Sequence, residues 1–115
     1  MPAVLNSPRE ISDVPTILIV EDSDRDFYAF LRAFRQIEIS QKAPFAFLRF
    51  DDGDEVLDYL FREKEYANLD APYPIAMLLD LNLPGTDGRT ILRRVKKDPR
   101  LCRLPTIVLR GLLNK

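Results

Sequence analysis

Two short apolar runs in this 115-residue chain each end directly at a carboxylate, and this pattern constrains the fold more than any other feature. The first run, 17–20, stops at Glu21 and Asp22, and the second, 76–79, stops at Asp80. Uninterrupted runs of this length are typical of strands that are buried on both faces of a parallel sheet. Because the carboxyl ends of parallel strands meet at one edge, the three carboxylates converge there if the two strands are neighbours.

Strand and helix patterns alternate along the chain, and this alternation predicts βαβ units with right-handed crossovers in a single α/β domain. The expected strands are 16–20, 45–50, 75–79 and 106–109. Ser23 or Asp24 can cap the first expected helix, whose apolar stripe is predicted to face the core: Phe27, Phe30, Leu31, Phe34 and Ile37. The second opens at Asp54, the third spans 89–97, and residues 63–74 are predicted to be a polar loop.

Charge and hydropathy exclude several classes of partner. The formal net charge is −1, so bulk electrostatics give no reason to expect binding to nucleic acid or to an acidic membrane surface. A local cluster of basic side chains is interpreted as a solvated helix face in preference to a contact with a phosphate backbone: Arg93, Arg94, Lys96 and Lys97. Residues 2–14 lack the apolar core of a signal peptide, and no apolar run approaches membrane-spanning length.

The side chains that the sequence lacks exclude several kinds of chemistry. Cys102 is the single cysteine, which excludes an internal disulfide and suits a reducing cytoplasm. There is no histidine, so a Ser-His-Asp triad and a histidine-ligated metal are also excluded. Any phosphohistidine involved in the function must therefore belong to another protein. We predict a cytoplasmic protein in which Cys102 is a packing or surface residue.

The predicted carboxylate cluster favours a small, hard cation. Two carboxylates about 4 Å apart repel by roughly 4 kcal/mol at an effective dielectric constant near 20, unless a proton or a cation neutralises them. Mg²⁺ prefers oxygen ligands, several waters and a phosphate oxygen, and a main-chain carbonyl at Asn82 would complete such a set. A site of this kind favours phosphoryl transfer onto Asp80.

Each carboxylate also has a structural interpretation. Glu21 and Asp22 alone would suit the start of a helix, and Asp80 alone would suit the end of a strand. The occurrence of both groups directly after apolar strands favours the functional interpretation. Asp87 is predicted to cap the following helix, and the second acidic group is predicted to form a turn and a helix cap: Asp51, Asp52 and Asp54.

In these motifs the chain resembles the receiver domain of a two-component response regulator. It is most similar to the short single-domain regulators that partner bacterial and cyanobacterial phytochromes and related histidine kinases. The resemblance covers about 16–109 and rests on the segments ILIVED (17–22), DDGDEVL (51–57), LLDLNLPGTDG (78–88), DP (98–99) and PTIVL (105–109).

The resemblance implies a flavodoxin-like, doubly wound parallel sheet. It also implies that Asp80 is the phosphoacceptor, that Asp22 is a direct Mg²⁺ ligand, and that Glu21 acts at the metal mainly through water. The main-chain carbonyl of Asn82 would be the third protein ligand. The phosphoryl donor would be a histidine kinase, phytochrome-type in the subgroup that the chain resembles most, or a small acyl phosphate.

The chain departs from the family pattern near its C-terminus. Arg110 occupies the position of a small hydroxyl residue, and Lys115 comes too early to match the lysine that pairs with the phosphoryl oxygens. We therefore expect a leader over 1–14 and a C-terminally incomplete receiver domain over 15–115. This domain is expected to have four strands in the order 2-1-3-4 and to lack the last helix-strand-helix. Such a domain would be a marginal monomer, or would form a homodimer or exchange segments to cover an exposed sheet edge.

Three functional hypotheses follow. The first is a phosphoacceptor that signals by protein contact and catalyses only its own phosphorylation. The second is a degenerate receiver, which binds a kinase without productive switching. The third is a phosphohydrolase with Asp80 as nucleophile, which is disfavoured because Asn82 stands where enzymes of the haloacid-dehalogenase type usually place an acid/base aspartate.

Overall fold

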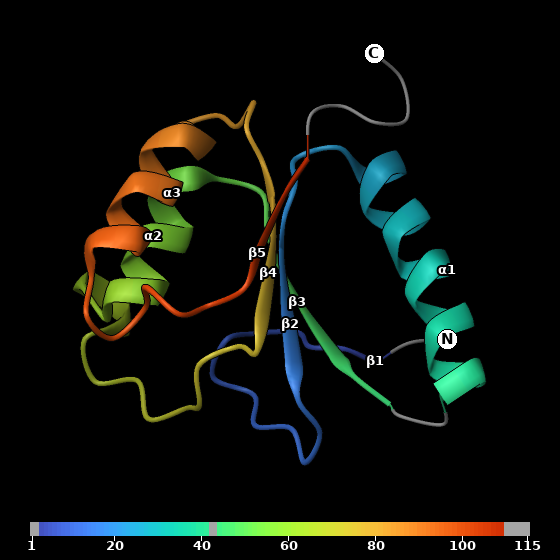
Figure 1. Cartoon of the computed structure of the whole chain (residues 1–115). Coiled ribbons are helices and arrows are strands. Elements are labelled where there is room, and N and C mark those ends of the chain that lie inside the picture. Colours follow the sequence, from blue (N-terminus) through green and yellow to red (C-terminus); the bar gives the residue numbers. More distant parts are fainter. Residues whose placement is uncertain (1–2, 42–43, 110–115) are drawn as a thin grey trace.

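The structure is a computed structural model that describes residues 3–41 and 44–109. Five parallel strands form one sheet in the order β1-β3-β2-β4-β5, with α1 on one face and α2 and α3 on the other (Figure 1). The strands are β1 (Ala3–Val4), β2 (Thr16–Val20), β3 (Ala46–Phe50), β4 (Ala76–Asp80) and β5 (Thr106–Leu109). The helices are α1 (Asp24–Gln41), α2 (Gly53–Phe61), the 3₁₀ turn η1 (Lys64–Tyr66) and α3 (Gly88–Lys97).

The order of the four predicted strands, 2-1-3-4, is confirmed as β3-β2-β4-β5. The pairing of β2 with β4 matters most for function, because Val20 lies opposite Leu79 in the register. Each of these residues directly precedes an acidic residue that the sequence analysis selected. In the described part of the chain, no helix is both long enough and apolar enough to cross a membrane.

The segment expected to be a leader contributes a strand. Ala3 and Val4 of β1 pair with Ala46 and Phe47 of β3, and the N–H of Leu5 donates to the Phe47 carbonyl at 2.8 Å. A two-residue strand is too short to show a period, so the sequence pattern gave no sign of it. The predicted boundary between 14 and 15 stays a prediction.

Alternation along β3 divides the core between the two faces of the sheet. Leu48 and Phe50 face α2 and α3 within the larger cluster, and Phe47 belongs to the smaller cluster beneath α1. The predicted apolar stripe of α1 is confirmed for Phe27 and Leu31, which are buried. Phe30 and Phe34 are partly buried against the smaller cluster.

The prediction that Ile37 is in the core was wrong, since its side chain is 45% exposed. The reason is length. An 18-residue helix extends about 27 Å, whereas a five-residue strand extends only about 17 Å. The last turns of α1 therefore run past the sheet.

The predicted polar loop, 63–74, is more ordered than expected. It contains η1, whose Tyr66 is 2% exposed and donates its hydroxyl hydrogen to Glu55 at 3.0 Å. Tyr66 also packs edge-on against Tyr59 of α2. One buried aromatic ring thus fixes the start of this connection against the larger core cluster.

The contrast between Leu31 and Ile37 gives a test of the packing of α1. Leu31→Ala should lower the free energy of unfolding by about 2–5 kcal/mol, because Leu31 is only 1% exposed. Ile37→Ala should change it by less than about 1 kcal/mol. Urea unfolding followed by circular dichroism would measure both, and equal losses in the two variants would contradict the placement of α1.

Candidate functional site

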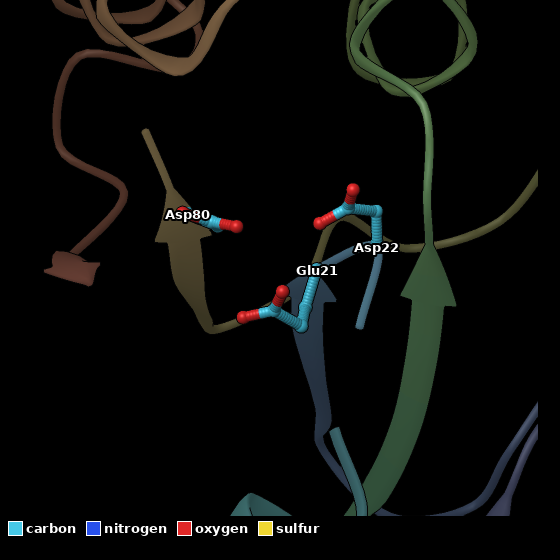
Figure 2. Close-up of side chains that lie close together, drawn as sticks. All are labelled: Glu21, Asp22 and Asp80. Atoms are coloured by element: carbon cyan, nitrogen blue, oxygen red, sulfur yellow. The ribbon is translucent and has the colours of Figure 1, made fainter. Parts of the chain in front are cut away.

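Three carboxylates meet at the carboxyl edge of the sheet. Glu21 and Asp22 follow β2, and Asp80 ends β4. One carboxylate oxygen from each residue lies within 4.8 Å of the others. Figure 2 shows Asp22 and Asp80 pointing toward each other from these two strand ends, with the Glu21 carboxyl group beside them. The structure thus brings together the residues that the sheet-edge argument joined, although their roles as ligands and phosphoacceptor stay predictions.

Two of the three carboxylates are withdrawn from solvent. Glu21 is 2% exposed and Asp80 is 4% exposed, whereas Asp22 is exposed. The pKa of Glu21 is raised to about 7, mainly by burial; the nearby charges of Asp80 and Asp26 add to this rise, and the hydrogen bond from the Ser23 N–H opposes it. Without a cation, the cluster therefore retains a proton on Glu21 at a pH where an ordinary glutamate is ionised.

The loop between β2 and α1 holds Glu21 through local hydrogen bonds. The N–H of Ser23 donates to the Glu21 carboxylate at 3.1 Å. The Ser23 hydroxyl oxygen accepts from the N–H of Asp26 at 3.2 Å, which confirms the prediction that Ser23 can cap α1. Sequence reasoning missed Asp26, which is 2% exposed and lies in the first turn of α1.

The loop between β4 and α3 shapes the surroundings of Asp80. The N–H of Asn82 donates to the Asp80 carboxylate at 3.0 Å. Gly88 begins α3 so close to β4 that a Cβ atom there would stand 2.4 Å from the Asp80 carbonyl oxygen. Asp87 caps α3 by accepting from the N–H groups of Arg89 and Thr90, as the sequence analysis predicted.

The helix cap predicted within the second acidic group is confirmed. Asp52 caps α2 by accepting from the N–H of Asp54 at 2.9 Å. Sequence reasoning missed a longer connection, in which Asp54 accepts from both the N–H and the hydroxyl group of Thr86 in the β4–α3 loop. These two donors lower the pKa of Asp54. The start of α2 is therefore tied to the loop that follows Asp80.

The residues of the cluster fit Mg²⁺ by their chemistry. Among the described residues, the three carboxylates are the one group of acidic, cysteine or histidine side chains close enough to share an ion. All three offer hard oxygen ligands, and their crowding is unfavourable without a neutralising charge. The carbonyl of Asn82 stays a predicted ligand, while Arg110 and Lys115 lie outside the described residues.

Comparison with known proteins agrees with this geometry, although no model of a known protein family matches the chain. The response regulator Rcp1 of Synechocystis is 37% identical over 93 residues, which are 81% of this chain and 59% of Rcp1. The phosphorylated cyanobacterial phytochrome response regulator RcpA superposes with a TM-score of 0.68 at 38% identity, covering 88% of this chain and 68% of RcpA. The chain belongs to the response regulator receiver family.

Two further solved structures extend the comparison for this receiver domain. The bacteriophytochrome response regulator AtBRR gives a TM-score of 0.74 at 33% identity, covering 87% of this chain and 69% of AtBRR. The Mn²⁺-bound form of Rcp1 gives a TM-score of 0.64 at 35% identity, covering 88% of this chain and 68% of that structure. In the sequence comparison, the chain spans about three-fifths of the full length of Rcp1.

The raised pKa of Glu21 predicts a pH dependence of stability in metal-free buffer. The ordinary pKa is 4.5 and the folded value is about 7, so the folded domain keeps a proton that the unfolded chain has lost. Stability should therefore fall as the pH rises from about 4.5 to 7, by at most about 1.4 kcal/mol per unit. Chemical denaturation at a series of pH values would measure this fall.

Glu21→Gln should remove that part of the pH dependence, because the amide does not titrate. The exposed Glu63→Gln serves as the matched control and should keep the wild-type profile. Superimposable pH profiles for wild type and Glu21→Gln would show that Glu21 ionises normally.

Proposed function

We propose that this receiver domain is a phosphoacceptor in a two-component phosphorelay, with Asp80 as the residue that receives the phosphoryl group. The observation that carries the proposal is the position of Asp80. Asp80 is buried at the end of β4, and one of its carboxylate oxygens lies within 4.8 Å of a carboxylate oxygen of Glu21 and of Asp22, in a chain of the receiver family. The structure of RcpA is that of its phosphorylated form, and this property of the relative supports the same reaction here.

In the proposed step, a carboxylate oxygen of Asp80 attacks the phosphorus of the donor. The P–N bond to a phosphohistidine, or the P–O bond of an acyl phosphate, breaks, and its electron pair leaves with the donor. Bound Mg²⁺, held by Glu21, Asp22, Asp80 and the Asn82 carbonyl, would offset the charge on the phosphoryl oxygens. The N–H of Asn82 fixes the Asp80 side chain by its hydrogen bond.

The proposed partner is a histidine kinase of the phytochrome type, since RcpA, AtBRR and a second bacteriophytochrome response regulator, RtBRR, are phytochrome-associated by name. The chain has no histidine, so the phosphohistidine must come from the partner. We place this exchange in the cytoplasm, and we assign no catalysis to the chain beyond transfer onto Asp80.

Self-association also belongs to the proposal. In the described sheet β5 is an edge strand, and Ile107 at its centre is 58% exposed. Unpaired N–H and C=O groups along such an edge favour pairing with another strand. A homodimer or an exchange of segments would cover this edge.

Phosphorylation can be tested by intact-protein mass after incubation with acetyl phosphate and Mg²⁺. We expect one added phosphoryl group in the wild type and none in Asp80→Asn, because the amide is not a nucleophile at this step. A chelator should block the addition. Asp87→Asn is the matched control, since Asp87 lies in the same loop but caps α3, and it should still be phosphorylated.

An unmodified wild type, shown by circular dichroism to be folded, would contradict the proposal. That result would favour the degenerate receiver, a module that binds a kinase without accepting phosphate. Addition that persists in Asp80→Asn would instead place the acceptor at another residue.

A further inference from the structure

The side chain of Arg49, in β3, reaches the β2–α1 loop, which carries the site carboxylates Glu21 and Asp22. It alternates with Leu48 and Phe50 and shares the α1 face of the sheet with Phe47, at the carboxyl end of the strand. An arginine at this position is unexpected, because its neighbours on that face are apolar. Its side chain is 20% exposed, so the guanidinium group is largely enclosed by protein.

The guanidinium group contacts both ends of the β2–α1 loop. Its Nε donates to the main-chain carbonyl of Glu21 at 3.0 Å, and its NH1 nitrogen donates to the Asp24 carboxylate at 2.7 Å. The planar group also stacks over the Phe27 ring, with its central carbon 4.6 Å from the ring centroid. Three contacts in different directions fix one orientation of the guanidinium group, which a lysine ammonium could not reproduce.

The two hydrogen-bonded residues flank Asp22 and Ser23. Glu21 precedes this pair and Asp24 begins α1, so the Arg49 contacts close the loop at its base. The Asp24 side chain is 81% exposed, and an exposed ion pair alone would contribute little. The orientation of the loop is therefore fixed mainly by the hydrogen bond to the Glu21 carbonyl and by the packing of the guanidinium group on Phe27.

We propose that Arg49 is a positioning residue for the metal site, which fixes the loop so that Asp22 and Glu21 face the cation. The inference rests on the proposed function and adds to it a residue outside the acidic cluster. Arg49 touches neither the metal nor the phosphoryl group in this role. It acts through the main chain of Glu21, in the way that residues behind metal ligands orient them.

The first test is Mn²⁺ binding to the unphosphorylated protein, followed by electron paramagnetic resonance of the free ion. Arg49→Met keeps an apolar stem over Phe27 and removes both hydrogen bonds. It should raise the Mn²⁺ dissociation constant by roughly tenfold. Arg49→Lys should recover only part of this loss. Arg35→Met, at an exposed position of α1, is the matched control and should bind as the wild type does.

A second readout needs no metal. Amide hydrogen exchange over 21–26 should speed up in metal-free Arg49→Met, while the strands keep their protection. Asp24→Asn removes the ion pair at an exposed side chain, and it should weaken Mn²⁺ binding less than Arg49→Met does. The double variant should bind no more weakly than Arg49→Met, because both changes act on the same contact.

The outcomes separate this inference from the function on which it rests. If the wild type binds Mn²⁺ and Arg49→Met binds it equally tightly, the inference is wrong and the metal site stands. A lower unfolding free energy with unchanged Mn²⁺ affinity would likewise reduce Arg49 to a structural role. If the wild type binds no Mn²⁺, the proposed metal site fails and the inference falls with it.

Discussion

The parallel pairing of β2 with β4 is the interaction on which the site depends. Its register sets Val20 opposite Leu79, so the residues that follow these strands meet at one edge of the sheet. The hydrogen bonds of the ladder hold Glu21 and Asp80 in a buried position, although two carboxylates this close together are unfavourable when both are charged. The larger and smaller core clusters, on opposite faces, stabilise this central pair of strands and thereby hold the charges together.

The sequence predicted the features that leave a local pattern in the chain, namely apolar periodicity and the residues that begin or end an element. Four strands, their order, and the caps at Ser23, Asp52 and Asp87 could be inferred because each has a local signal in the chain. The convergence of the acidic residues followed from one topological rule, that parallel strands point the same way.

The missed features depend on distances between segments that are remote in the sequence. Arg49 could have been noticed as a charge at an apolar position of a strand, but its partners in the β2–α1 loop lie 25 or more residues earlier. The contact between Asp54 and Thr86 spans 32 residues and has no pattern of its own. The exposure of Ile37 was missed because helical periodicity shows which face of a helix is apolar, not how far the sheet beneath it extends.

The bond between Asp54 and Thr86 has a consequence for how a signal would leave the site. Thr86 lies in the loop that follows Asp80, and Asp54 lies in the first turn of α2. Any rearrangement of that loop must either pull the start of α2 along or break two hydrogen bonds. Movement of this loop is therefore linked to a helix on the far side of the sheet from α1, which makes the first turn of α2 a natural place to attach a reporter group.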